Sequence, residues 1–193
     1  DLRNVDSFDL DAVTIELGAR IGVDELSKID EYKRYAITDD GVSPWALPGT
    51  RDGMTLVTGN ERNEWGLVST EPTNRKAMMD KRYRKIASVI DDLPLGRKWG
   101  DEDAEVGLLG IGMETGVVFE AIERLSGLGL STKGLQPRTL WPVLDETFEF
   151  IASCRVVYVV EHNMQGQLRQ LLMSQGVAGE KLLGFRRYDG LQT

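Results

Sequence analysis

Four polar side chains near the end of the chain have the types needed for acid–base or binding chemistry. They are Glu161, His162, Asn163 and Gln167, which supply a carboxylate, an imidazole and two amides. They follow residues 155–160 (RVVYVV), the strongest predicted strand of the chain. In open α/β sheets, ligands bind at the carboxyl ends of the parallel strands. A ligand or catalytic site at this edge is therefore one hypothesis for these residues.

Nucleophilic catalysis lacks its usual signals here. The sequence has no nucleophile elbow, and its single cysteine, Cys154, precedes the same strand and so belongs at the opposite end of the sheet. One histidine and one cysteine also give no metal-ligand spacing. We therefore favour the interpretation that these polar groups cap the following helix and pair across an interface.

A second group with two carboxylates lies in residues 58–66 (TGNERNEWG). Glu61 and Glu64 are three residues apart with Arg62 between them, and a pair of carboxylates can serve acid–base chemistry. Such a group is more often an ion-paired turn, and we predict that role for it at a subunit contact.

A glycine-rich turn follows another predicted strand, residues 106–111, and precedes an amphipathic helix, residues 113–125. Residues 110–116 read GIGMETG, which is GxGxxxG and not the GxGxxG of dinucleotide-binding turns. Glu114 falls where the helix amides would meet a phosphate, and its charge would repel an anion. The signal for a bound nucleotide is therefore weak, and anion binding at this turn stays an open question.

Residues 74–90 are predicted to form a helix with Asn74 as its N-cap. Its apolar stripe consists of Met79, Tyr83, Ile86 and Ile90. The other faces are basic and carry Arg75, Lys76, Lys81, Arg82, Arg84 and Lys85. Such a run could bind phosphate or an acidic partner, but we favour a solvated face that offsets the acidic neighbours on either side.

The elements that position these residues alternate regularly in the second half of the chain. Strands are predicted at residues 106–111, 135–140, 155–160 and 181–185, with intervening helices at 113–125, from Asp145 onward, and at 165–175. Glycines at 127 and 129 are expected to close the first of these helices. The alternation predicts an α/β fold with a small, doubly wound, mainly parallel sheet. The polar residues 95–103 suggest a boundary, and we assign residues 91–193 to this domain.

The first half of the chain has little periodicity. Residues 1–30 are acidic and are interpreted as a solvated linker or arm, and residues 31–73 are rich in turn signals, with one short strand candidate at residues 54–58. Trp45 and Trp65 are expected to be packing residues in these loops. Long loop-rich stretches are uncommon inside compact domains, so we predict an arm that lies over a neighbouring domain or subunit.

The composition of the chain disfavours some classes of binding partner. The chain of 193 residues has a formal net charge of -8, which disfavours nucleic acid because phosphate contacts need a basic surface. No apolar stretch approaches the roughly 20 residues that span a bilayer, and no signal peptide opens the chain, so no membrane partner is expected. The single cysteine fits a reducing, cytoplasmic compartment. Because the sequence begins at Asp1 without methionine, we expect a piece of a longer polypeptide.

Four stretches resemble segments of the alpha subunit of 2-oxoacid:ferredoxin oxidoreductases, in particular the 2-oxoglutarate type. They are residues 35–49 (YAITDDGVSPWALPG), residues 58–66 with the basic residues of 74–82, residues 105–121, and residues 159–168 (VVEHNMQGQL). Together they cover nearly all the chain in the family's order. Arg62 stands where the family usually has histidine, His162 where it usually has an acid, and Met113 where it has serine.

The resemblance implies an enzyme that decarboxylates a 2-oxoacid on thiamine diphosphate, reduces ferredoxin through an iron–sulfur cluster, and forms an acyl-CoA. It implies that this segment binds no cofactor, since the diphosphate and magnesium site and the cluster cysteines belong to the beta subunit. Residues 1–90 would be the end of the thiamine pyrimidine-binding domain with its arm and basic helix. Residues 91–193 would resemble the C-terminal domain of transketolases, with a role in packing subunits around the cofactor.

Two other functions remain as alternatives. A free-standing α/β ligand-binding module would use the sheet edge near Gly112 and Glu161, but the GxGxxxG spacing and Glu114 oppose it. A small hydrolase is opposed by the missing pair of nucleophile and base. The sequence leaves open whether the 2-oxoacid is 2-oxoglutarate, pyruvate or a branched-chain oxoacid.

Overall fold

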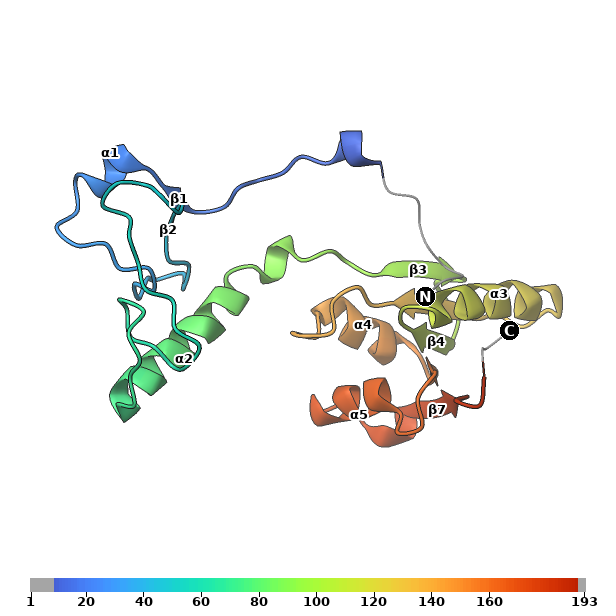
Figure 1. The fold of residues 1–193 in the computed structure, drawn as a ribbon. Helices are drawn as coiled ribbons and strands as arrows, with labels where there is room; N and C mark the ends of the chain where they lie inside the picture. Colours follow the sequence, from blue (N-terminus) through green and yellow to red (C-terminus); the bar gives the residue numbers. More distant parts are fainter. Residues whose placement is uncertain (1–8, 191–193) are drawn as a thin grey trace. The chain divides into compact units, whose positions relative to one another are not determined.

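The strands and helices expected in the second half of the chain are present in the computed structural model, which describes residues 9–190 (Figure 1). These residues divide into two compact units, residues 9–92 and residues 93–190. The first unit is rich in loops and contains one long helix, and the second contains the sheet.

Five strands form the sheet: β3 Arg97–Gly100, β4 Val106–Gly110, β5 Lys133–Gln136, β6 Val156–Glu161 and β7 Leu182–Arg186. Their order is β3-β5-β4-β6-β7, and every pairing is parallel except that of β3 with β5. The predicted α/β fold with a mainly parallel sheet is confirmed. The strand expected at residues 135–140 instead ends at Gln136, because Pro137 has no N–H to continue the ladder.

The antiparallel strand β3 was not predicted. It lies in the polar stretch 95–103 that we interpreted as a boundary, and it occupies an edge of the sheet. Three of its four residues are exposed, so it lacks the apolar pattern that identifies a strand in the sequence.

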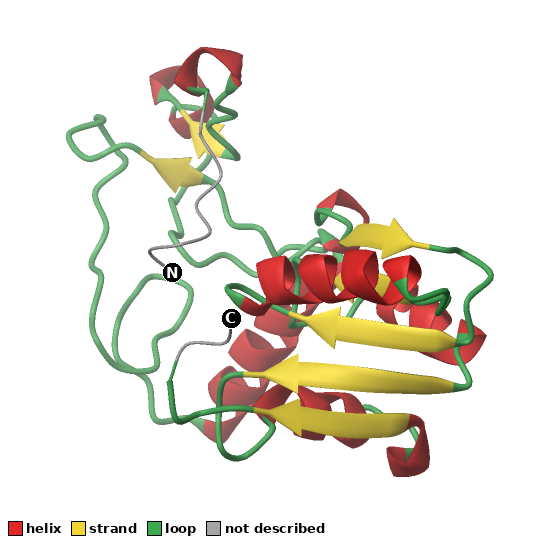
Figure 2. Cartoon of the chain, turned by 90° about the vertical axis from the view of Figure 1, so that its right-hand side faces the viewer, coloured by secondary structure: helices red, strands yellow, loops and turns green. Residues whose placement is uncertain are grey.

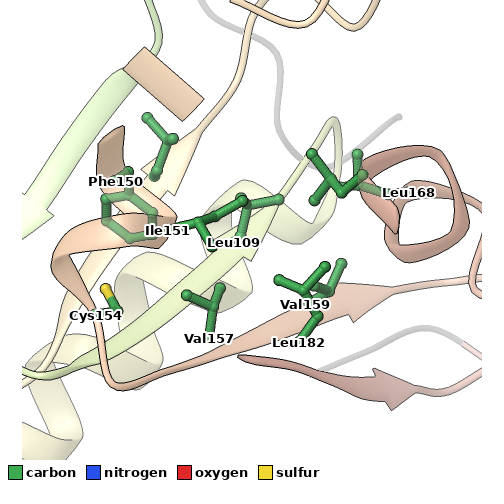
Figure 3. Packing of buried hydrophobic residues seen from close by; sticks show 10 residues of the cluster. Leu109, Phe150, Ile151, Cys154, Val157, Val159, Leu168 and Leu182 are labelled. Carbon is green, nitrogen blue, oxygen red and sulfur yellow. The ribbon is translucent and has the colours of Figure 1, made fainter. Parts of the chain in front are cut away.

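Helices cover both faces of the sheet, as Figure 2 shows. They are α3 Glu114–Gly127, α4 Asp145–Ser153 and α5 Gln167–Ser174, and a 3-10 turn, Gly179–Lys181, precedes β7. Neighbouring residues of a strand point to opposite faces, and β4 illustrates this. Leu109 joins the larger cluster with residues of α4 and α5 (Figure 3), whereas Leu108 joins Val118 and Ile122 of α3. The doubly wound arrangement is therefore confirmed.

The end of α3 follows the predicted glycine chemistry. Gly129 has a φ of 77°, a left-handed conformation that glycine adopts without strain. Its amide donates to the Ser126 carbonyl over 2.9 Å, and the Leu130 amide donates to the Leu125 carbonyl over 3.0 Å. These two bonds are those of a Schellman motif, and they satisfy carbonyls that the helix end leaves unpaired.

Residues 9–92 hold short elements around one long helix. They are a 3-10 turn Leu10–Ala12, β1 Arg20–Ile21, α1 Val23–Leu26, β2 Trp45–Ala46, α2 Pro72–Ala87 and a 3-10 turn Ile90–Asp92. Strand β1 pairs with β2 in parallel. The strand predicted at residues 54–58 is wrong, since these residues are coil. The carbonyl of Leu56 instead packs closely against Gly66. A Cβ at position 66 would lie 1.8 Å from the Leu56 oxygen, so only glycine fits beside this coil segment.

Helix α2 differs from the prediction in its start and in its buried face. It begins at Pro72, whose fixed φ suits the first helical position, and Asn74 lies inside its first turn and not at its cap. Its buried residues are Met78 and Lys81, whereas Tyr83 of the predicted apolar stripe is 60% exposed. Among residues 9–190, no helix combines the length and apolar character needed to cross a membrane.

Replacing Gly107 by alanine should lower the free energy of unfolding by about 1–3 kcal/mol, because the core has no room for the methyl group. A Cβ there would lie 2.8 Å from the Cys154 sulfur and 3.0 Å from the Phe150 ring. Gly127→Ala is the matched control, since its Cβ would meet nothing within 4 Å and alanine favours a helix by up to about 1 kcal/mol. Urea denaturation measures both, and a Gly107→Ala protein as stable as wild type would contradict the packing described.

Candidate functional site

The carboxylate of Glu161 lies at the carboxyl end of β6 and is buried, with the residue only 3% exposed. It accepts hydrogen bonds from the backbone amides of Leu168, over 2.6 Å, and Arg169, over 3.3 Å. These amides belong to the first turn of α5, whose N–H groups have no partner inside the helix. A carboxylate there also interacts favourably with the helix dipole. Glu161 therefore joins β6 to the start of α5.

Asn163 completes this loop. Its Oδ1 accepts from the amides of Gly166, over 2.6 Å, and Gln167, over 3.1 Å, and its Nδ2 donates to Glu161 over 3.1 Å. Gly166, with a φ of 72°, precedes the helix in the left-handed conformation. The side chain of Gln167 is exposed, and Nδ1 of His162 is buried with no hydrogen-bond partner in residues 9–190. The structure thus brings Glu161 and Asn163 together and takes only the backbone N–H of Gln167 into the same network.

This arrangement suits a loop anchor better than a catalytic base. The carboxylate oxygens of Glu161 already accept from backbone amides, and a base must have an oxygen available for a substrate proton. The amides at the start of α5 are likewise occupied and cannot hold an anion. At the neighbouring strand β4, Glu114 is buried in the first turn of α3. Cys154 is buried near the amino end of β6, opposite to the end that carries Glu161. Burial raises the pKa of its thiol.

The second predicted group is centred on Glu61. Its carboxylate pairs with Arg75 and Arg82 of α2, and one bond from Arg82 Nη1 to Oε2 measures 3.2 Å. The hydrogen bonds from Arg82 lower the pKa of Glu61 to about 2. Because a general acid or base needs a pKa near the working pH, Glu61 is unsuited to either role at neutral pH. It fastens the loop of residues 58–66 to α2.

Glu64 and Arg62 have different partners from Glu61. Glu64 Oε1 lies 3.7 Å from Lys33 Nζ and accepts from the Ile37 amide over 3.4 Å. Arg62 donates from Nη1 to the Tyr35 hydroxyl over 2.6 Å. Glu61 and Glu64, which were considered as a possible acid–base pair, therefore serve separate contacts within residues 9–92.

Sequence reasoning missed the role of Lys81. This residue is 7% exposed, and its ammonium group donates to the Tyr35 carbonyl over 2.9 Å and to the Ser43 hydroxyl. Burial, followed by the nearby charge of Arg34, lowers its pKa to about 8. The available signal was its position three residues after Met78, which places both on one face of α2.

Named proteins have sequences similar to that of this chain. The chain is 34% identical over 146 residues to subunit alpha of 2-oxoacid:ferredoxin oxidoreductase 2 from Aeropyrum pernix, covering 74% of this chain and 22% of that protein. It is 29% identical over 146 residues to the alpha subunit of the Saccharolobus solfataricus 2-oxoacid:ferredoxin oxidoreductase, covering 74% and 23%. The chain is a homologue of these alpha subunits. The resemblance inferred from the sequence is confirmed, although no protein-family model matches the chain.

A solved structure of a 2-oxoacid:ferredoxin oxidoreductase also matches the chain. The 2-oxoglutarate:ferredoxin oxidoreductase from Magnetococcus marinus, with 2-oxoglutarate, coenzyme A and succinyl-CoA bound, matches with a TM-score of 0.73 and 36% identity. The match covers 80% of this chain and 27% of that chain. The chain spans less than a quarter of the length of the two curated alpha subunits.

The described residues do not fit the metal groups that this family implies. Within residues 9–190, no group of three or more His, Cys, Asp and Glu side chains could hold a metal ion. An iron–sulfur cluster needs several thiolates, and Cys154 is a buried thiol with a raised pKa.

Replacing Asn163 by alanine should lower the free energy of unfolding by roughly 1–3 kcal/mol, because the amides of Gly166 and Gln167 lose their acceptor. Gln167→Ala is the matched control in the same loop. Its side chain is exposed, so its effect should stay within about 0.5 kcal/mol. Thermal or urea denaturation distinguishes them, and equal stabilities would show that the Asn163 bonds contribute nothing.

Glu61→Gln should destabilise the protein in a pH-dependent way. The folded pKa of Glu61 is lowered from 4.5 to about 2, so its ion pairs stabilise the fold above pH 4.5 and are lost as the pH falls toward 2. The difference from wild type should be roughly 1–2 kcal/mol at pH 6 and should shrink steadily below pH 4.5. Glu16→Gln, at an exposed coil residue without a side-chain bond in residues 9–190, should show no such trend. A pH-independent difference for Glu61→Gln in urea denaturation would contradict the pairing.

Proposed function

We propose that this chain is part of the alpha subunit of a thiamine-diphosphate-dependent 2-oxoacid:ferredoxin oxidoreductase. The named relatives support the oxidoreductase and its ferredoxin acceptor. The Magnetococcus marinus enzyme, with 2-oxoglutarate, coenzyme A and succinyl-CoA bound, favours 2-oxoglutarate as the substrate and succinyl-CoA as the product. The partners of this chain are then the beta subunit, coenzyme A and ferredoxin, and the compartment is the cytoplasm.

Within that enzyme, we assign the segment to subunit assembly and enclosure of the cofactor site. The observation that carries this role is the exposed apolar surface of residues 9–92. Met54 is 92% exposed, Val57 is 62% exposed and Tyr83 is 60% exposed, and further exposed apolar residues are Leu56, Leu67, Val68, Ile86 and Ile90. We interpret these exposed apolar side chains as part of a contact with another protein.

The domain assignment follows from the same proposal. Residues 1–90 are assigned to the end of the thiamine pyrimidine-binding domain with its arm and helix, and residues 91–193 to a transketolase-C-like domain. The parallel sheet and the likeness to the oxidoreductase structure support the second assignment. The candidate groups around Glu61 and Glu161 then hold loops in place for contact with other subunits.

Tyr83→Glu should weaken the association of this chain with the rest of the oxidoreductase by at least about tenfold. A carboxylate introduced into an apolar contact loses its hydration without gaining a partner. Co-expression with the beta subunit, followed by sedimentation of the purified complex over a concentration series, measures the change. Ferredoxin reduction that depends on 2-oxoglutarate and coenzyme A serves as the activity measurement for the assembled enzyme.

Thr73→Glu is the matched control, because it makes the same charge change on an exposed residue of α2 outside the apolar stripe. It should assemble like wild type. The assembly role is contradicted if Tyr83→Glu assembles with unchanged affinity, or if both variants lose affinity equally. An assembled wild-type enzyme that does not reduce ferredoxin with 2-oxoglutarate would contradict the proposed substrate.

A further inference from the structure

A pocket of about 360 Å³ within residues 9–92 is lined by five cationic residues and no acidic one. The cations are Arg34 and Arg62 from the loops and Lys81, Arg82 and Lys85 from α2. Tyr35 and Ser43 add two hydroxyl groups to its wall. This concentration of positive charge is unexpected in a chain whose net charge is -8. The loop anchors described above use Arg62, Lys81 and Arg82, but they do not account for Arg34 and Lys85.

Three of the cations surround one aromatic ring. The Arg62 Cζ lies 4.9 Å from the centre of the Tyr35 ring, the Arg34 Cζ 5.2 Å, and the Lys81 Nζ 5.9 Å. The Tyr35 hydroxyl also accepts the 2.6 Å bond from Arg62, and its carbonyl accepts from Lys81. Tyr35 therefore fixes the positions of like charges that would otherwise separate.

Most of this charge has no matching carboxylate. Arg82 is paired with Glu61, but the side-chain bonds of Arg62 and Lys81 go to neutral oxygens. The side chains of Arg34 and Lys85 make no hydrogen bond or ion pair with any other described residue. The nearby charge of Glu64 favours the charged form of Lys81. The charges of Arg34, Lys85 and Arg82 disfavour that form. The pocket is therefore prepared for an added anion.

The wall of the pocket is built by close backbone packing. Gly41 has a φ of 78°, and a Cβ there would lie 2.4 Å from the Lys81 carbonyl oxygen and 2.5 Å from the Lys85 amide nitrogen. Arg84 donates to the Thr38 carbonyl over 3.3 Å and holds the same loop from the next turn of α2. The backbone that carries the donors is therefore in place before any ligand arrives, which lowers the entropic cost of binding.

We propose that this pocket binds the phosphoryl group of a small phosphorylated ligand. Guanidinium groups match phosphate oxygens with paired donors, and a dianion balances two or more of the unpaired charges. Lys81, one of the donors, is almost fully buried, so a compact anion reaches it more readily than a carboxylate carried on a protein surface. The inference concerns residues 9–92 alone and does not rest on the proposed oxidoreductase activity.

Calorimetric titration of the full chain with inorganic phosphate and with pyrophosphate, at fixed ionic strength in chloride, tests the proposal. Both anions should bind, and pyrophosphate should bind more tightly because it carries more charge. Arg34→Gln and Lys85→Gln should each weaken binding by roughly tenfold, the loss of one charged hydrogen bond. These side chains make no hydrogen bond or ion pair with other described residues, and Arg34 only stacks on the rings of Tyr35 and Trp45, so circular dichroism should show both variants folded.

Lys76→Gln is the matched control, because it removes one positive charge from α2 at an exposed residue that does not line the pocket. Its affinity for both anions should equal that of wild type. The proposal is overturned if neither anion binds at millimolar concentration, or if all three variants weaken binding equally, which would indicate nonspecific attraction. It is also overturned if a glutamate-rich peptide binds more tightly than pyrophosphate, which would make the pocket a docking site for protein. None of these outcomes would affect the assembly measurements with Tyr83→Glu.

Discussion

The buried ammonium group of Lys81 is the interaction on which residues 9–92 depend most. Loops without strand ladders leave carbonyl groups that need donors, and an unpaired buried carbonyl is costly. Lys81 supplies such a donor to Tyr35, 46 residues away in the chain, and at the same time reaches the Ser43 hydroxyl. Glu61 acts in the opposite sense by accepting from two arginines of α2. Hydrogen bonds and ion pairs of long charged side chains thus hold residues 9–92 together, whereas apolar packing stabilises the sheet.

The sequence predicted the elements of residues 93–190 well, because the spacing of apolar residues there matches the buried positions of the strands and helices. Strand β4 is buried on both faces, and β6 buries Val157, Val159 and Val160. Their near-continuous apolar runs identify central parallel strands. Strand β3 was missed because an edge strand needs no such run. On α2 the predicted face was wrong because the buried face combines Met78 with the hydrogen-bonded Lys81, and a charged residue gives no apolar signal. Periodicity carries no information about that choice.

For the candidate site residues, the sequence predicted positions but not contacts. The sequence located Glu161 and Asn163 at the end of a strand, since strand order alone places them there. It could not say whether the carboxylate meets a substrate or a backbone amide, because that depends on how the loop returns to α5. The spacing of Glu61 and Glu64 suggested joint action, but partners on α2 and at Lys33 separate them. The path of the loops in the folded chain decided each of these roles.

The position of Cys154 makes the sheet unit observable separately from the loops. The residue is 2% exposed and its sulfur lies close to Gly107 and Phe150, so alkylating reagents reach it only when this core opens. The chain has no other cysteine, and therefore a single chemical label reports on one half of the molecule. The rate of native-state alkylation would measure the opening equilibrium of residues 93–190 without interference from residues 9–92. The same burial keeps the thiol in its reduced form under mild oxidants.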